Sequence, residues 1–133
     1  MEQDTINFGE HLTLDGYMGD KKLLNDKDAV FNWLNNLPEE LGMHKISEPQ
    51  IVIAGTNGDK DPGGISGTVM IAESHISVHT FVERRFASAD VYTCKNSMDT
   101  DFIVEYFKKN FGFQDVETHL IKRGTRYPAK NIE

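Results

Sequence analysis

The sequence from Ser66 to Cys94, SGTVMIAESHISVHTFVERRFASADVYTC, places many reactive side chains between apolar ones. From residue 75 to 79, histidine and serine alternate with apolar residues, a two-residue period that predicts a strand with one apolar and one polar face. A second alternating run covers residues 87–92. We therefore expect two adjacent strands, one carrying His79 and the other leading to Cys94, with a break before the first at Glu73 and Ser74.

Two further segments have the spacing of amphipathic helices. Apolar residues recur three or four positions apart after Asn25 or Asp26, either of which can cap a helix start, and Pro38 is expected to kink or restart that helix. The same spacing follows Asp99 and stops at Gly112, a typical helix end. Trp33 is expected in the core or at an interface.

The remaining strands complete the predicted fold. Alternation predicts strands at residues 11–17 and 116–121, and the apolar run Ile51–Ala54 is typical of a short buried strand. Residues 1–8 are polar, and we expect them to be loose. Successive strands with two helices predict an α+β two-layer sandwich, in which an antiparallel sheet has its helices on one face.

Composition limits the kinds of partner. A chain of 133 residues is expected to form a single domain, residues 1–133, and its net charge of −7 argues against a nucleic-acid partner. No apolar run is long enough to span a membrane and no apolar leader opens the sequence, so we expect a cytoplasmic protein. The only cysteine, Cys94, excludes an internal disulfide and leaves either a core residue or a reactive thiol.

The central motif resembles a known family. The string AESHISVHTFVE at residues 72–83, preceded by GISG and followed by DVYTC, is similar to the processing and catalytic core of the prokaryotic S-adenosylmethionine decarboxylases. Shorter matches at residues 9–12 (GEHL), 24–26 (LND) and 121–124 (IKRG) extend the resemblance over most of the chain. The resemblance implies the same α+β fold and a lyase that cleaves itself at a Glu-Ser bond.

The resemblance also implies a role for each residue of the motif. Ser74 would attack the carbonyl of Glu73, which divides the chain into residues 1–73 and 74–133 and converts Ser74 into a covalent pyruvoyl group, the cofactor. His79 matches the histidine that transfers protons during this autocatalytic cleavage, and Ser66 matches the serine that supports its intermediate. Cys94 matches the proton donor of the decarboxylation.

The implied reaction removes carbon dioxide from S-adenosyl-L-methionine, held as a Schiff base, and supplies the aminopropyl donor for spermidine and other polyamine biosynthesis. Glu83 matches a glutamate that binds the ribose and Phe81 an aromatic residue that stacks on adenine. The family usually has a proline between these two, and Lys60 stands where it has a second aromatic. An ornithine or arginine decarboxylase of the same family is therefore the alternative. The family precedent implies a homodimer of cleaved protomers.

Three other classes compete with this interpretation. A metal site would use His75 and His79, but residues four apart on a strand lie about 13 Å apart, so no metal is expected. A Cys-His hydrolase would need a feature that lowers the pKa of Cys94, and none is visible in the sequence. An unprocessed regulatory paralogue would fold in the same way, but Ser66, Ser74, His79 and Cys94 are all present, which favours an enzyme.

Overall fold

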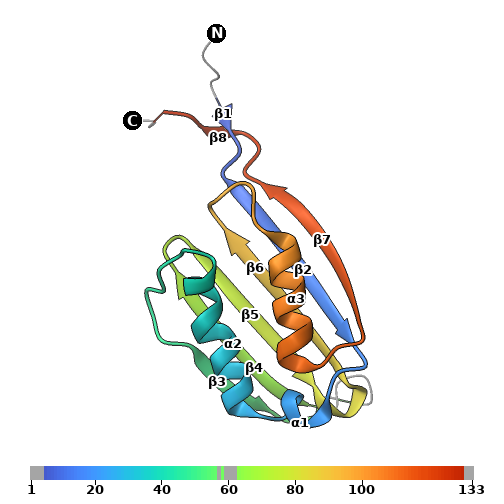
Figure 1. The fold of residues 1–133 in the computed structure, drawn as a ribbon. Coiled ribbons are helices and arrows are strands. Elements are labelled where there is room, and N and C mark those ends of the chain that lie inside the picture. The colour runs from blue at the N-terminus through green and yellow to red at the C-terminus, as the bar shows by residue number, and fades with distance from the viewer. Residues whose placement is uncertain (1–4, 57, 59–62, 131–133) are drawn as a thin grey trace.

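The computed structural model describes residues 5–56, 58 and 63–130. It contains a six-stranded sheet whose neighbouring strands are all antiparallel, in the order β3-β4-β5-β6-β2-β7. All three α-helices lie on one side of this sheet (Figure 1), which confirms the predicted two-layer α+β fold. The six strands are β2 (Gly9–Tyr17), β3 (Gln50–Ala54), β4 (Gly64–Ile71), β5 (Ser74–Phe81), β6 (Phe86–Thr93) and β7 (Asp115–Arg123).

The two long helices begin where the sequence predicts, whereas a short helix before them was not predicted. A single turn, α1 (Lys21–Leu24), precedes α2 (Lys27–Glu40), and the Asp26 side chain caps α2 by accepting two backbone N–H groups of its first turn. The restart predicted at Pro38 does not occur, because α2 continues through it to Glu40. Pro38 lies in the last turn of α2, two residues before its end.

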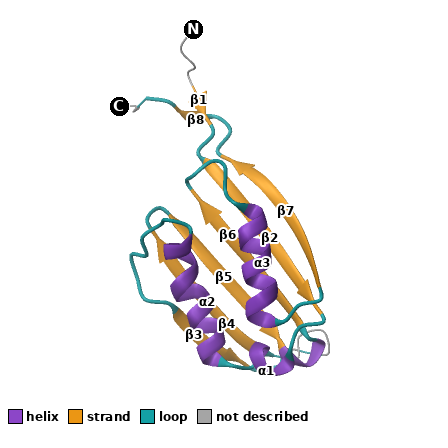
Figure 2. Cartoon of the chain, in the orientation of Figure 1, coloured by secondary structure: helices purple, strands orange, loops and turns teal. Residues whose placement is uncertain are grey.

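The second long helix, α3 (Thr100–Phe111), is capped by Asp99 and ends at Gly112 in the left-handed conformation, as predicted. The two long helices lie over the same face of the sheet (Figure 2), and their buried apolar residues join its residues in one core. Trp33 of α2 is fully buried, with ring centroids 5.7 and 6.1 Å from Phe107 and Phe111 of α3, which confirms its predicted place in the core.

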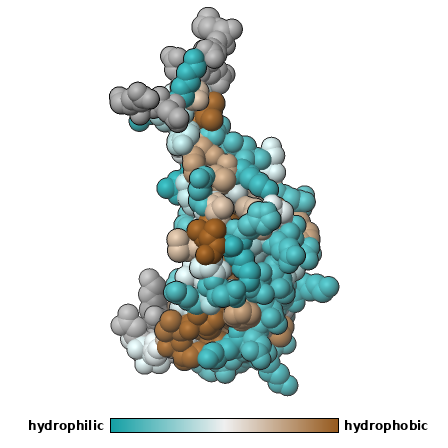
Figure 3. Space-filling model, turned by 90° about the vertical axis from the view of Figure 1, so that its left-hand side faces the viewer, coloured by the Kyte–Doolittle hydropathy of each residue, from teal (hydrophilic) through white to brown (hydrophobic). Residues whose placement is uncertain are grey.

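Two predictions fail at the margins of the sheet. β3 was predicted to be buried, but it is an edge strand in which Val52 is 63% and Ile53 60% exposed. Figure 3, which views this side of the molecule, shows apolar side chains gathered there. Residues 1–8 were expected to be loose; residues 1–4 lie outside the described residues, but Thr5–Ile6 form β1, which pairs with β8 (Tyr127–Pro128) beyond the end of the main sheet.

The face of the sheet away from the helices carries the polar residues of the alternating strands. In β5, Ser74, Ile76 and the following even-numbered residues are buried, whereas the odd-numbered residues are half-buried or exposed. We call this second surface the open face; no described helix covers it (Figures 1 and 2). Among the described residues, no helix is both long and apolar enough to span a membrane.

Candidate active site

The bond predicted to be cut lies in the tight turn between β4 and β5. Ile71 pairs with Ser74, so that Ala72 and Glu73 are the two residues of the turn, and both are exposed. Glu73 has φ = 62°, a left-handed conformation that is costly for a residue with a side chain and that turns of this kind usually give to glycine. Backbone strain is thus found at the residue whose carbonyl Ser74 is predicted to attack.

Ser74 and Cys94 lie side by side at one end of the sheet. Ser74 is the first residue of β5, and Cys94 directly follows the last residue of β6, the neighbouring strand. The hydroxyl oxygen of Ser74, which is 8% exposed, accepts the backbone N–H of Cys94 at 3.0 Å. The Cys94 thiol is free and half-buried. The structure therefore brings together the predicted source of the pyruvoyl group and the predicted proton donor.

Ser66 and His79 form a second pair. They face each other in the β4–β5 register, and Ser66 Oγ lies 2.8 Å from Nδ1 of His79. A hydroxyl within hydrogen-bond distance of an imidazole can exchange protons with it. The side chains predicted to assist self-cleavage are thus in contact with each other.

The two pairs lie at opposite ends of β5. His79 follows Ser74 by five residues, which corresponds to about 16 Å along a strand. Ser74 is also buried on the helix side, whereas His79 is exposed on the open face. His79 and Cys94 do come from adjacent strands, as predicted, but a single protomer does not bring all four residues together.

The predicted substrate-binding residues lie near His79. Phe81 ends β5, and its ring packs 5.5 Å from that of Phe86 on β6. Glu83 lies in the short 3₁₀ helix η1 (Val82–Arg84), its side chain 70% exposed and ion-paired with Lys21 at 3.2 Å. Lys60, which stands at the position of the family's second aromatic, lies outside the described residues.

A buried carboxylate supports the Cys94 end of the sheet. Glu10 of β2 faces Thr93 in the register, its side chain is 3% exposed, and it accepts the Met98 N–H at 2.8 Å and the Lys122 ammonium at 2.6 Å. The hydrogen bond from Lys122, followed by that from Met98, lowers the pKa of Glu10. No role was predicted for Glu10, although it lies within the matched string GEHL at residues 9–12.

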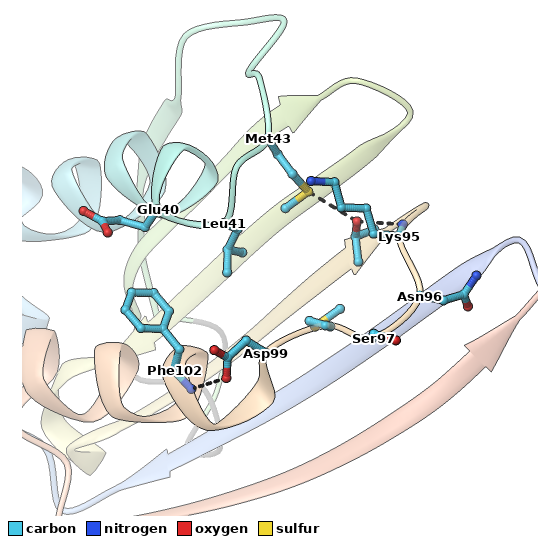
Figure 4. A pocket seen from close by; sticks show the side chains of 10 residues that line it. Glu40, Leu41, Met43, Lys95, Asn96, Ser97, Asp99 and Phe102 are labelled. Atoms are coloured by element: carbon cyan, nitrogen blue, oxygen red, sulfur yellow. Dashed lines mark hydrogen bonds between the residues drawn. The ribbon is translucent and has the colours of Figure 1, made fainter.

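A pocket of about 370 Å³ opens between the end of α2 and the start of α3, on the helix side of the segment that follows β6 (Figure 4). Neither Ser74 nor Cys94 lines it. Its walls are Glu40, Leu41, Met43, Thr93, Lys95, Asn96, Ser97, Met98, Asp99 and Phe102.

A polar cluster on the open face was also missed. The Asp90 carboxylate of β6 accepts hydrogen bonds from Ser77 Oγ, from His75 Nε2 at 3.2 Å and from His11 Nε2 at 2.6 Å. Arg123 Nη1 lies 2.9 Å from Nδ1 of His11. Because arginine only donates hydrogen bonds, Nδ1 of His11 accepts, and the ring proton is on Nε2, directed at Asp90.

Among the described residues, this cluster is the one group whose ligand atoms lie close enough to hold a metal ion: those of His11, His75 and Asp90 lie within 4.8 Å of one another. A histidine that binds a metal through one nitrogen normally donates the N–H of the other. Nδ1 of His11 faces an arginine donor instead, and the arginine adds a positive charge. The donor set therefore suits hydrogen bonding within the protein better than a cation.

Comparison with known proteins gives a consistent result. The family model described as S-adenosylmethionine decarboxylase matches residues 10–124. The S-adenosylmethionine decarboxylase proenzyme of Pyrococcus abyssi is 34% identical over 122 residues, which are 91% of this chain and 81% of the relative. That of Acidithiobacillus ferrooxidans is 30% identical over 118 residues, 89% of this chain and 84% of the relative.

Among solved structures, the adenosylmethionine decarboxylase from Aquifex aeolicus superposes with a TM-score of 0.75 over 96% of this chain and 99% of its own. Its sequence identity is 24%, so the superposition establishes the shared fold and no more.

Proposed function

The chain belongs to the S-adenosylmethionine decarboxylase family, and we therefore propose that it matures by cleavage between Glu73 and Ser74 and acts through the residues paired above. It is a self-processing, pyruvoyl-dependent proenzyme that decarboxylates S-adenosylmethionine, and the family implies a role in spermidine biosynthesis. The contact between the Ser74 hydroxyl and the backbone of Cys94 is the observation that supports the proposal, because it joins the residue predicted to be cleaved to the predicted proton donor.

Self-cleavage begins at the turn. The Ser74 hydroxyl attacks the carbonyl carbon of Glu73, the peptide C–N bond breaks, and an ester forms between the two residues. Loss of the α-proton of Ser74 expels the Glu73 carboxylate and leaves dehydroalanine, which water converts to the pyruvoyl group with release of ammonia. The left-handed backbone at Glu73 supports this assignment, since strained backbone clusters at reactive sites.

Decarboxylation needs an electron sink and a proton. The pyruvoyl group supplies the sink for the electron pair left when carbon dioxide departs. Cys94 provides the proton to the substrate carbon, a role that suits a half-buried thiol at the end of β6 better than nucleophilic attack. No helix starts at Cys94, since α3 begins at Thr100, so the thiol lacks the helix N-terminus that activates many nucleophilic cysteines.

We assign the complete site to a homodimer. A two-fold axis parallel to the open face and perpendicular to β5, passing near the middle of that strand, would place the His79 end of one protomer over the Ser74 end of the other. Ser66 and His79 would then serve the partner's cleavage site, with Phe81 and Glu83 beside them. Val52 and Met70 expose apolar surface on or beside the open face, which such an interface would cover.

The experiment that tests the proposal is the intact mass of freshly purified protein under denaturing conditions, followed by decarboxylation assays with S-adenosylmethionine, ornithine and arginine. Cleavage after Glu73 divides the 133 residues into pieces of 73 and 60, the second blocked by a pyruvoyl group. A chain that never matures would favour the unprocessed regulatory paralogue.

We place the enzyme in the cytoplasm, where its lone thiol stays reduced.

A further inference from the structure

Asp90 connects three strands through a single carboxylate. Its partners are Ser77 and His75 on β5 and His11 on β2, the strands on either side of β6. An ionised carboxylate only accepts hydrogen bonds, and all three partners can donate one. The Asp90 side chain is 20% exposed, so these bonds are partly shielded from water. The Asp90 carboxylate thus has its hydrogen-bond donors within the fold.

Two of these partners, His75 and Ser77, lie directly after the bond that is proposed to be cut. His75 follows Ser74 directly, and Ser77 is the next residue of β5 on the same face. Once the chain is cut before Ser74, β5 no longer continues into a turn but begins at a free end. Strand ends fray unless other contacts hold them.

Fraying here would move the reactive group itself. Residue 74 would be attached to the rest of β5 only through the amide nitrogen of His75, so any opening at His75 displaces it from Cys94. A misplacement of about 1 Å can cost on the order of 100-fold in rate. Backbone pairing of β5 with β4 and β6 also holds the strand, but this pairing ends at Ser74 and His75, where the free end begins.

We propose that Asp90 is a positioning residue that holds the new end of β5 in register after the cut; this inference rests on the proposed self-cleavage. It binds the side chains of His75 and Ser77 from β6, and its bond to His11, which Arg123 orients, fixes the carboxylate itself. Asp90 does not touch the reacting atoms, and its importance arises only when the covalent link before Ser74 is lost.

The test compares Asp90→Asn in cleaved and uncleaved protein. Amide hydrogen exchange is measured for peptides that cover residues 75–81, in the cleaved chain and in a Ser74→Ala background that keeps the turn intact. Asp115→Asn is the matched control, because it removes one negative charge from the same face at the far end of β7. Ser77→Ala, which removes a single donor, is the second variant should Asp90→Asn fold poorly.

We expect Asp90→Asn to raise exchange at residues 75–79 about tenfold in the cleaved chain and less than about twofold in the Ser74→Ala background. Its kcat should fall about tenfold or more at nearly unchanged KM, Ser77→Ala should give a smaller loss, and Asp115→Asn should change neither. Equal exchange increases in the two backgrounds would reduce Asp90 to an ordinary structural residue and overturn the proposal.

Three further outcomes can be distinguished. A wild-type chain that is never cleaved contradicts the proposed function and the proposed role of Asp90 together, whereas a cleaved chain indifferent to Asp90→Asn contradicts only the latter. Loss of activity on dialysis against EDTA, restored by Zn²⁺ alone, would make the cluster a metal site and overturn the hydrogen-bonding role.

Discussion

The hydroxyl oxygen of Ser74 accepts the backbone N–H of Cys94 at 3.0 Å, so that these residues are joined without use of the cysteine side chain. Any residue except proline at position 94 can make this bond. The thiol therefore remains available for a separate task, and the two stages of the chemistry can be separated by mutation.

Cys94→Ala is expected to cleave normally and to lose decarboxylation by roughly 10² to 10⁴-fold, the contribution typical of a positioned acid or base. Ser74→Ala, which removes the attacking hydroxyl, should leave the chain whole. Intact mass measures the first stage and carbon dioxide release the second. Unchanged turnover by Cys94→Ala would show that the substrate carbon takes its proton from another group.

The separation of the two pairs along β5 leads to a prediction about mixed dimers. Cys94→Ala and His79→Ala proteins, each inactive alone, should regain activity when expressed together, because one of the two sites in a mixed dimer would contain only intact residues. Random pairing makes half of the dimers mixed, so about a quarter of the wild-type rate is expected. No recovery despite demonstrated mixed dimers would contradict a shared site.

Glu10 should make stability depend on pH. Its pKa is lowered in the folded protein, so ionised Glu10 stabilises the fold above its ordinary pKa of 4.5, and this contribution is lost as pH falls through the lowered folded value. Glu10→Gln keeps an oxygen for the Met98 N–H and loses the charge that binds Lys122. It should lower the free energy of unfolding by about 1 to 2 kcal/mol at pH 7.

The measurement is urea unfolding in the Ser74→Ala background, where the chain stays whole and unfolding can be two-state. The loss of stability caused by Glu10→Gln should shrink towards zero as the pH is lowered from above 4.5 through the lowered folded pKa of Glu10. A loss that stays constant with pH would mean that packing, rather than the ionised carboxylate, stabilises this end of β2.

The left-handed turn residue gives a fourth prediction. In the Ser74→Ala background, Glu73→Gly should raise the stability of the precursor by about 0.5 to 1 kcal/mol, since glycine adopts φ = 62° without steric cost but loses more backbone freedom on folding. Glu73→Val should lower it by about 1 to 3 kcal/mol, because β-branched residues rarely adopt positive φ. Equal stabilities of the two variants would mean that the turn relaxes.

Local sequence signals predicted the elements that depend on local physics. Asp26 and Asp99 cap helices because their carboxylates reach backbone N–H groups two or three residues away, and alternation in β5 and β6 follows from burial of one face. A two-residue turn after Ile71 also fixes the partner of His79 as Ser66, so this pair could have been deduced from the sequence.

What the sequence could not predict depends on which strands become neighbours. An apolar run such as Ile51–Ala54 looks the same in the centre of a sheet and at its edge, and β1, with two residues, has no period to detect. The Asp90 cluster requires β2 to lie beside β6, although His11 and Asp90 are 79 positions apart. Such pairing is set by the whole core rather than by either strand.

Cleavage in the tight β4–β5 turn would change how the protein unfolds and refolds. Cutting it would leave two chains held together by the β4–β5 ladder and by β2, which pairs with both β6 and β7 of the second chain. The precursor can unfold and refold as one molecule, but two separated fragments must find each other again, and the ester chemistry cannot rejoin them. The stability of the mature enzyme would then be kinetic: the rate of unfolding, rather than a folding equilibrium, would set how long it stays active. Each molecule would be assembled only once.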